Sequence, residues 1–525
     1  MNGLLVLYAS DLSKYAFEPV LNGKNSIILA LEQALKFPNV GKTVLLADKN
    51  ADFSFLNGIE IEQREKWTKR CLFEKISELQ TGFDLIYFAF ADTPFLDPAL
   101  AGVIAERHLQ KRAEYSYADG YPFGLTPEIL SPGTAGILAK ILDVDGSVEK
   151  NILFSVIEKD INSFDIEVEI SPVDLSSHRL ALNADSKRNF LLLNNFLDSC
   201  NGKIPAASDV ERIVQNQPEI LRTLPNYYSI QVYGGCLGQC KICPYPLFTD
   251  VKGRNDFLDC NKFEHLLDKI IEFSGDAVIN FSLWGEIALH TQKLKLIESV
   301  IKRSELALII ETSGLGWKNE ELENILSLCN ELSCNAARIN PLSPLSWIVS
   351  LDTADSQKYT ELRGPGFAEA DAFAKKLLSM FPDDCYVQAV RTDGSEEDTE
   401  KFYRYWKDAA PNGEKNIIIQ KYDHFCGQLE KRQASDISPL IRQSCWHLMR
   451  DMAILIDGNV PLCREYLGAL KGETELLLGN VFNDSLDAIW KNGDRYYREH
   501  CKNNYTGSIF RGLCADCDEY YTYNF

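Results

Sequence analysis

Short apolar stretches alternate with amphipathic stretches along the first part of the chain. Residues 42–47 and 83–90 are apolar enough for buried strands, whereas residues 26–35 carry apolar side chains at helical spacing. Strands that alternate with helices predict a mostly parallel sheet covered by helices. We therefore expect an α/β domain with its core in residues 1 to about 145, completed by a mixed region and a helical connector that end at residue 222.

The same alternation returns between residues 223 and 430. Residues 229–233 alternate apolar and polar side chains as a half-buried strand does, and Gly234 and Gly235 then break the pattern. Polar residues collect where the later apolar stretches end, at the carboxyl edge where β/α barrels place their chemistry. The pattern predicts a second, six-stranded β/α domain, whose remaining strands are expected at residues 277–284, 306–311, 347–352, 386–391 and 416–421.

The length and charge of the chain narrow the classes of function. At 525 residues it is too long for one compact core, and its net charge of −21 argues against binding to nucleic acid phosphates or to an anionic membrane surface. No apolar run approaches the roughly 20 residues of a membrane-spanning helix. Residues 1–8 fit a buried strand and not an export signal, so we expect a cytoplasmic protein without nucleic acid or membrane partners.

Three cysteines follow the first strand of the second domain at a spacing typical of metal-binding loops. Cys236, Cys240 and Cys243 are separated by three and then two residues. Three thiolates leave one iron of a four-iron cluster without a protein ligand, so that iron can bind a substrate or cofactor. A zinc site is the alternative, although zinc favours a fourth ligand nearby.

This motif, placed after the first barrel strand, resembles the radical S-adenosylmethionine (SAM) superfamily. The resemblance implies a partial (β/α)6 barrel in which a 4Fe-4S cluster binds SAM, whose reductive cleavage produces a 5'-deoxyadenosyl radical that abstracts hydrogen. It assigns Gly285 and Glu286 to a loop near the methionine amino group. It also assigns Ser350 and Asp352, expected on one face of the fourth strand, to the ribose and methionine ends of SAM. Ile242 stands where the family usually has an aromatic residue near the adenine, and no side chain can be named as catalytic.

From residue 431 to residue 525 we expect a small cysteine-rich module. Four of its cysteines have the order and spacing of the SPASM module, which carries auxiliary iron–sulfur clusters, and these are Cys445, Cys463, Cys514 and Cys517. The resemblance implies one auxiliary 4Fe-4S cluster on these thiolates, with Cys501 as a spare or substitute ligand. A structural zinc on the same thiolates is the alternative. The Asp-Gly step at 457–458 predicts a hairpin over residues 453–463.

Cysteines gathered in short motifs, without an export signal, favour metal ligation in a reducing compartment over disulfides. The other cysteines have no motif, and we expect them to be small core residues: Cys71, Cys200, Cys260, Cys329, Cys334, Cys385 and Cys426.

The first domain has an acidic residue where a buried strand ends. Asp92 is well placed to hold a divalent metal against nucleotide phosphates. Together with Gly23-Lys24, it makes this domain resemble the nucleotidyltransferases with a glycosyltransferase-A-like fold. Those enzymes cradle the triphosphate with a glycine-rich loop, whereas residues 8–14 lack glycine and include Asp11, which would repel phosphates. We therefore expect a degenerate scaffold or binding domain in preference to active nucleotidyl transfer.

In the order of its domains the whole chain resembles the spiro-SPASM proteins of spirochaetes, a family that names no reaction. The leading hypothesis is a radical SAM enzyme that acts on a peptide or protein and receives electrons from a reducing donor. Two alternatives stay open. The first is radical modification of a nucleotide-linked or sugar-linked metabolite presented by the first domain, and the second is a non-catalytic metal-binding scaffold.

Overall fold

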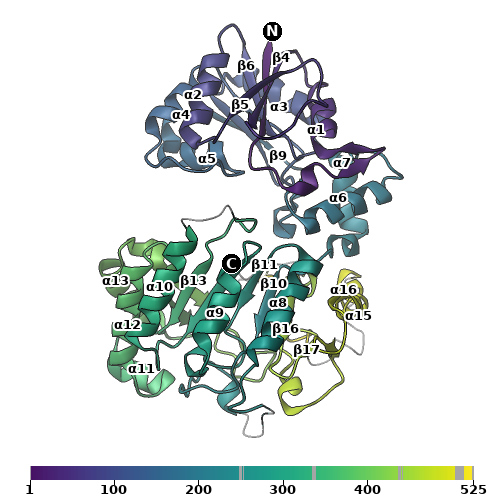
Figure 1. The fold of residues 1–525 in the computed structure, drawn as a ribbon. Coiled ribbons are helices and arrows are strands. Elements are labelled where there is room, and N and C mark those ends of the chain that lie inside the picture. The colour runs from purple at the N-terminus through teal and green to yellow at the C-terminus, as the bar shows by residue number, and fades with distance from the viewer. Residues whose placement is uncertain are drawn as a thin grey trace. The chain divides into compact units, whose positions relative to one another are not determined.

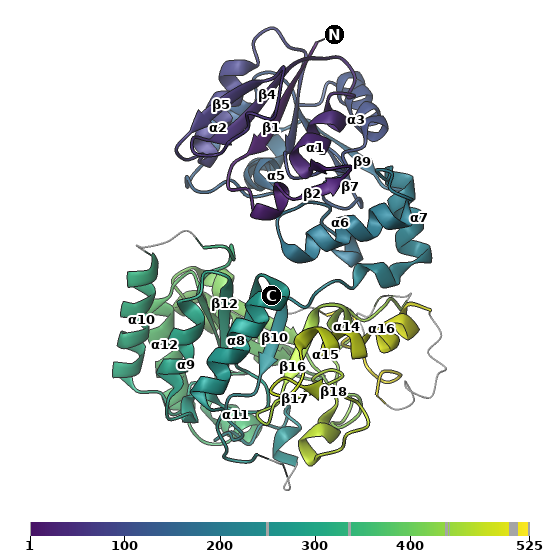
Figure 2. The same ribbon diagram turned by 45° about the vertical axis from the view of Figure 1, so that its right-hand side comes forward.

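The computed structural model describes residues 2–247, 251, 253–333, 338–435, 439, 442–502 and 513–522. The chain divides into two compact units, Met1–Leu221 and Arg222–Phe525, which are drawn in Figures 1 and 2. Cys334, expected in a core, lies outside the described residues. Among the residues that are described, none of the helices combines the length and the apolar character needed to cross a membrane.

A mostly parallel sheet forms the centre of the first unit. Its described strands lie in the order β5-β4-β1-β6-β8-β7-β9, and of these β8 alone runs antiparallel to its neighbours. The strands are β1 Gly3–Ala9, β4 Val40–Asp48, β5 Glu60–Arg64, β6 Leu85–Phe90, β7 Tyr115–Asp119, β8 Glu128–Leu130 and β9 Ile166–Ile170, with a separate hairpin of β2 Pro19–Leu21 and β3 Lys24–Asn25. The helices are α1 Ser26–Ala34, α2 Lys69–Leu79, α3 Pro98–Lys111, α4 Thr134–Ile141, α5 Ile152–Ile157, α6 Lys187–Ser199 and α7 Ala207–Asn216.

Local sequence explains these elements. Every residue of β1 is buried, as expected for a central parallel strand covered on both faces. Thr68 caps α2 by accepting from the Cys71 N–H, and Asp97 caps α3 by accepting from the Ala99 N–H. The predicted helix-covered α/β sheet is confirmed.

A parallel sheet also forms the centre of the second unit, with its helices α8 to α13 packed along it (Figures 1 and 2). Its described strands lie in the order β15-β14-β13-β12-β11-β10-β16. The strands are β10 Tyr227–Ile230, β11 Ala277–Asn280, β12 Leu306–Thr312, β13 Leu345–Ser350, β14 Cys385–Arg391, β15 Ile417–Lys421 and β16 Asp451–Ile454. The helices are α8 Cys260–Ser274, α9 Lys293–Ile301, α10 Asn319–Ser333, α11 Ser356–Arg363, α12 Phe367–Met380 and α13 Glu396–Ala409.

Six of these strands, β10 to β15, confirm the strands expected from the sequence. The seventh, β16, comes from the segment expected as the first arm of a hairpin, and it pairs in parallel with β10. The Asp-Gly turn itself is present, because the Gly458 N–H donates to the Leu455 oxygen at 2.8 Å and Gly458 has a φ of 86°. The two arms are joined across the turn, because the Leu455 N–H donates to the Asn459 oxygen at 2.9 Å, and the second arm, β17 Asn459–Pro461, also pairs with β18 Leu477–Asn480.

The C-terminal module completes the second unit with three short helices, α14 Trp446–Arg450, α15 Leu486–Asn492 and α16 Asp494–Cys501. Arg222 fastens this module to the segment that leads into β10. Its guanidinium stacks 3.5 Å from the centre of the Trp490 ring, donates to the Leu448 oxygen at 2.8 Å and pairs with Asp494. A buried arginine that uses both its flat face and its donors holds its partners in one arrangement.

Candidate active site

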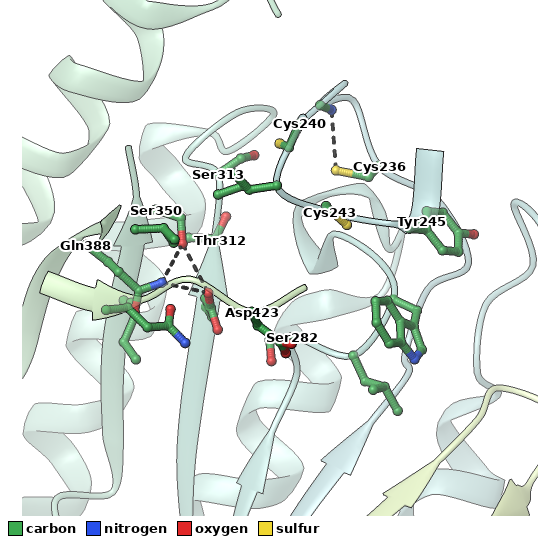
Figure 3. Close-up of a pocket in the computed structure, with 18 of the residues that line it drawn as sticks. Cys236, Cys240, Cys243, Tyr245, Ser282, Thr312, Ser313, Ser350, Gln388 and Asp423 are labelled. Carbon is green, nitrogen blue, oxygen red and sulfur yellow. Dashed lines mark hydrogen bonds between the residues drawn. The ribbon is translucent and has the colours of Figure 1, made fainter. Parts of the chain in front are cut away.

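A cavity of about 390 Å³ lies at the carboxyl ends of the strands of the second unit (Figure 3). Loops that follow β10, β11 and β12 form part of its wall, and side chains of β13, β14 and β15 form another part. Cys236, Cys240 and Cys243 all line it. The structure therefore brings the three thiols of the motif together at the edge where parallel sheets bind ligands.

Close backbone contacts shape the cysteine loop. A Cβ atom on Gly234 would lie 2.0 Å from the Gly253 oxygen, so a larger residue does not fit there. The Lys241 N–H donates to the Leu362 oxygen at 2.9 Å, which ties the loop to the end of α11. The glycine break that the sequence showed after the first strand is thus a requirement of the turn.

The space between the thiols suits a cluster better than a single zinc ion. Gly238 keeps it open, since a Cβ atom there would lie 3.1 Å from the Cys240 sulfur and 3.6 Å from the Cys236 sulfur. Burial raises the pKa of Cys236 to about 11 and that of Cys243 to about 12, so these thiols keep their protons unless a metal binds them. The described lining includes neither a histidine nor a fourth cysteine, so a tetrahedral zinc site would be incomplete. A four-iron cluster with one open iron fits this donor set.

Glu286 joins the loops that follow β11 and β12. Its carboxylate accepts hydrogen bonds from the Thr312 hydroxyl at 2.7 Å and from the Ser313 N–H and hydroxyl at 2.8 and 2.7 Å. Burial raises the pKa of Glu286, and these donors oppose the rise. Gly285 is sterically required, because a Cβ atom there would lie 1.7 Å from the Tyr233 oxygen. The Glu286 carboxylate is occupied by protein donors, so its role is to position the loop that lines the cavity.

The two residues expected on one face of the fourth barrel strand have different surroundings. Ser350 lines the cavity, where its hydroxyl donates to Glu311 at 3.1 Å and accepts from the Gln388 amide at 3.2 Å (Figure 3). Asp352 lies beyond the end of β13 with a φ of 66° and is not among the described lining residues. Its carboxylate accepts from Arg363 at 2.5 Å, and Arg363 lines the cavity. Asp352 therefore borders the cavity by holding Arg363, and its expected place at SAM stays a prediction.

Apolar and aromatic side chains cover another part of the cavity wall. Ile242 lines it from the cysteine loop, next to Tyr245, Trp284 and Phe425. The rings of Trp284 and Phe425 have their centres 5.5 Å apart, and the Tyr245 hydroxyl donates to the Gly234 oxygen at 2.8 Å. Aromatic surface is thus present although the cysteine loop itself has isoleucine at the usual aromatic position.

Charged side chains meet where the barrel contacts the C-terminal module. Asp423, Asp518 and Glu519 lie close enough together to bind a metal ion, but the Lys421 ammonium pairs with Asp518 at 2.9 Å and with Glu519 at 2.5 Å. Arg464, which lines the cavity, lies 3.6 Å from Asp423. Burial raises the pKa of Asp423 to about 6. Because Lys421 and Arg464 already pair with carboxylates of this group, it forms an ion-pair network in the cavity wall.

The cysteines expected to hold an auxiliary cluster also come together. They line a second, smaller cavity, and they are Cys445, Cys463, Cys514 and Cys517. Burial raises the pKa of Cys445 and Cys463 well above the usual value and that of Cys514 to about 12. Cys501 is absent from the described lining of this cavity. Cys426, expected in a core, lines it instead, so the sequence reasoning missed this thiol.

The acidic site of the first unit is filled by its own side chains. Asp92 accepts a hydrogen bond from the Asn183 amide at 2.7 Å, and Asp185 forms an ion pair with Lys150. Burial raises the pKa of Asp92 to about 6, and the nearby Lys150 charge opposes the rise. Lys150 therefore supplies the positive charge that a divalent metal would bring.

The loop after β1 is also occupied from within the unit. The Ser10 hydroxyl donates to the Asp48 carboxylate at 2.5 Å, and the Asp11 N–H donates to its other oxygen at 2.9 Å. A carboxylate from the end of β4 thus takes the backbone donor that a phosphate would need. With Lys150 beside Asp185, these residues do not fit a nucleotide bound through a metal ion.

Residues 445–518 match the SPASM family, described as an iron-sulfur cluster-binding domain. This match assigns the second group of thiols to an iron–sulfur site. An uncharacterized protein of Treponema pallidum (strain Nichols) is 33% identical over 384 residues, which are 71% of this chain and 99% of that protein. A second uncharacterized protein of the same organism is 38% identical over 58 residues, which are 11% of this chain and 26% of that protein.

Two solved structures share parts of the fold. A cytidylyltransferase from Leptospira borgpetersenii has 16% sequence identity and a TM-score of 0.37, over 42% of this chain and 96% of that chain. SuiB of Streptococcus suis, bound to precursor peptide SuiA, has 14% identity and a TM-score of 0.40, over 71% of this chain and 82% of that chain. At these identities and TM-scores, neither likeness carries an argument about activity.

Proposed function

The chain belongs to the same family as the uncharacterized Treponema pallidum protein and is a radical SAM enzyme with a SPASM module, and from this premise we propose that it abstracts hydrogen from a peptide or protein. The observation that carries the proposal is a cavity with the three thiols of the motif on one side and an edge strand of the described sheet on another. When bound, the 4Fe-4S cluster and SAM supply a 5'-deoxyadenosyl radical that removes the hydrogen atom.

Different residues around the cavity would hold the cofactor and shield it from solvent. Cys236, Cys240 and Cys243 would hold the cluster, and the loop positioned by Glu286 forms the neighbouring wall. The aromatic surface of Trp284 covers a further side. Exclusion of water by such a wall protects a reactive intermediate from side reactions.

The position of β15 supports a peptide as the substrate. In the described part of the chain β15 ends the sheet, so one side of its backbone has no partner strand there. Ile418 and Gln420 line the cavity, while Ile419 between them is 39% exposed. An extended peptide can add to such an edge through main-chain hydrogen bonds while its alternate side chains enter a pocket. Gln420 also offers an amide group, which matches the donor and acceptor of a peptide bond.

The auxiliary cluster on the SPASM module is proposed to accept or donate an electron during substrate turnover, and a separate reducing donor is proposed to supply the first cluster. The grouping of the cysteines into two short metal-binding motifs supports a reducing, cytoplasmic setting, which is part of the proposal.

Anaerobic reconstitution with iron and sulfide, followed by SAM and dithionite, tests the proposal. We expect 5'-deoxyadenosine release, and a rise of about tenfold, equivalent to about 1.4 kcal/mol of barrier, with some pools of short synthetic peptides. Pools of nucleotide sugars serve as the comparison. Stimulation by the nucleotide sugars and not by peptides would contradict the peptide proposal, whereas release of no 5'-deoxyadenosine at all would contradict SAM cleavage itself.

A further inference from the structure

The cavity of the SPASM module contains one thiol more than a four-iron cluster with four protein ligands uses. Besides the four cysteines of the module, its lining includes Cys426. Cys426 comes from the loop after β15, so it reaches the site from the barrel and not from the module. The fifth thiol is therefore a feature of tertiary structure.

Cys426 contacts one of the four cysteines directly. Both thiols line the same small cavity, and the two side chains interact with each other. The Cys517 sulfur also accepts from the Glu519 N–H at 3.4 Å. Cys426 and Cys517 are thus neighbours in this cavity, whereas the thiols recorded as neighbours of Cys445 are Cys514 and Cys517.

The backbone that presents Cys426 is strained. Phe425 and Cys426 have φ values of 50° and 53°, and Gly427 follows at 84°. Two consecutive residues other than glycine in the left-handed region are uncommon and persist only where the surroundings impose them. Here the Phe425 N–H donates to the Asp423 carboxylate at 2.7 Å, and the Gly427 N–H donates to the His424 ring at 2.8 Å.

The strained turn sends neighbouring side chains to two different cavities. Phe425 lines the larger cavity and packs on Trp284, while Cys426 lines the cavity of the SPASM module. The hydrogen bonds within the turn hold this conformation and so keep Cys426 in the cavity of the module. A thiol held there by a strained backbone is placed to belong to the metal site.

We propose that Cys426 is a fifth cluster-binding thiol of the auxiliary site and that it can replace Cys517 as the fourth ligand. Cys501, the spare ligand expected from sequence, contacts the Tyr497 hydroxyl and is not part of the described cavity lining. Because the proposal concerns cluster retention, it does not depend on the substrate or on SAM cleavage.

Cluster retention in single and double variants tests the proposal. All variants are made in a full-length chain whose first motif is removed by Cys236→Ala, Cys240→Ala and Cys243→Ala, so that about four irons per chain report on the auxiliary site alone. We expect Cys426→Ala and Cys517→Ala each to keep about four irons, with the electron paramagnetic resonance spectrum of a reduced four-iron cluster. The double variant should retain less than about half of the iron, because neither thiol is left for the fourth iron of a site that otherwise has four protein ligands.

Cys445→Ala is the matched control, since the thiols recorded next to Cys445 are Cys514 and Cys517 and not Cys426, and it should lose iron as the double variant does. The proposal is overturned if Cys517→Ala loses as much iron as Cys445→Ala, or fails to fold where Cys426→Ala folds. It is also overturned if the double variant keeps its cluster, because a thiol other than Cys426 then supplies the ligand.

Discussion

The two units place polar side chains at the carboxyl ends of parallel strands, but they complete those sites in opposite ways. In the first unit Lys150 neutralises Asp185, Asn183 donates to Asp92, and Asp48 accepts from the loop after β1. In the second unit Cys236, Cys240 and Cys243 face a cavity whose described lining has no fourth thiol or imidazole. The first site satisfies itself with protein groups, and the second needs a cofactor.

The difference teaches that a position at a strand end does not by itself make a working site. Asp92 stands where a metal ligand is expected, yet its surroundings already contain a cation. The cysteine loop stands at the equivalent edge with donors that bind metal only after they lose their protons. The state of the partners, and not the position of the residue, separates a scaffold from a catalytic centre.

The largest expected effect concerns the cysteine loop of the second unit, which is the site that needs a cofactor. Cys240→Ala removes one of three cluster ligands, so 5'-deoxyadenosine release from SAM should fall by about a thousandfold or more, to the level without protein. Anaerobic release assays measure this directly. Cys200→Ala, which removes a thiol outside both cavities, should leave the rate unchanged, and equal loss in the two variants would show that the motif is not the initiating site.

The stability of the first unit should depend on pH through Asp92. Its pKa rises from the usual 3.8 to about 6 because burial penalises the charged form, so the folded state holds a proton that the unfolded chain has released between about pH 4 and pH 6. Stability should therefore fall as pH rises through this window, by up to about 3 kcal/mol. Asp92→Asn removes this dependence on pH. The stability of the variant relative to the native protein should therefore increase between pH 4 and pH 7.

Urea unfolding of the full chain can follow this unit through Trp67, its one tryptophan, with fluorine-labelled tryptophan and NMR. Asp185 is the control of opposite sign. Burial raises its pKa, but Lys150 and Asn189 outweigh burial and leave the pKa below the usual value. Asp185→Asn should therefore lower the stability at pH 7. This loss should become smaller as pH falls through the lowered pKa of Asp185. A gain at pH 7 from both variants would contradict the assignment of charges.

Lys150→Met tests whether this lysine occupies the place of a metal ion. Without the ammonium, Asp92 and Asp185 repel each other, and Mn²⁺ should bind at least about tenfold more tightly than to the native chain, as expected from loss of one neighbouring like charge. Electron paramagnetic resonance of free Mn²⁺ measures the affinity. Lys159→Met, which removes an exposed ion pair with Asp143, should leave it unchanged. Tight Mn²⁺ binding to the native chain that Asp92→Ala abolishes would make the first unit a working metal site.

The smallest of these effects concerns the loop beside the cysteines. Glu286→Gln replaces an acceptor-only carboxylate, which takes hydrogen bonds from Thr312 and Ser313, with an amide that has only one acceptor oxygen. We expect the Kd for SAM to rise by about tenfold, the worth of one charged hydrogen bond. Equilibrium dialysis of the reconstituted protein measures it. The control is Glu298→Gln on α9, where the glutamate forms an exposed pair with Lys302, and it should leave the Kd unchanged. If the Kd for SAM is also unchanged in Glu286→Gln, then Glu286 does not contribute to SAM binding.

The strands and the first metal site were predictable because their signals are local. Buried parallel strands appear as apolar runs, so β10 to β15 could be found from the sequence, and the cysteines of one short loop must lie near one another whatever the fold does. The surroundings of Asp352 were not predictable in this way, because the alternation assumed for that residue does not show that β13 ends at Ser350 or that the Asp352 carboxylate accepts from Arg363.

What the sequence did not show depends on contacts between distant segments. Cys426 reaches Cys517 only because the turn after β15 folds against the module, and no spacing rule links the two residues. The pairing of Lys150 with Asp185 is equally invisible, since a lysine outside any motif reads as an exposed charge. The partner of each of these groups had to be read from the tertiary structure.

The strand β16 has a consequence for cooperativity. It belongs to the C-terminal module, yet it pairs with β10 over Tyr227 to Ile230, at one edge of the described sheet that carries the cysteine loop. The module therefore cannot detach without opening a ladder of the barrel, and the two should protect their backbone amides as one unit. We expect the backbone amides of β16 and β10 to exchange at the same slow rate. Loss of either cluster should then raise the exchange rate in both strands.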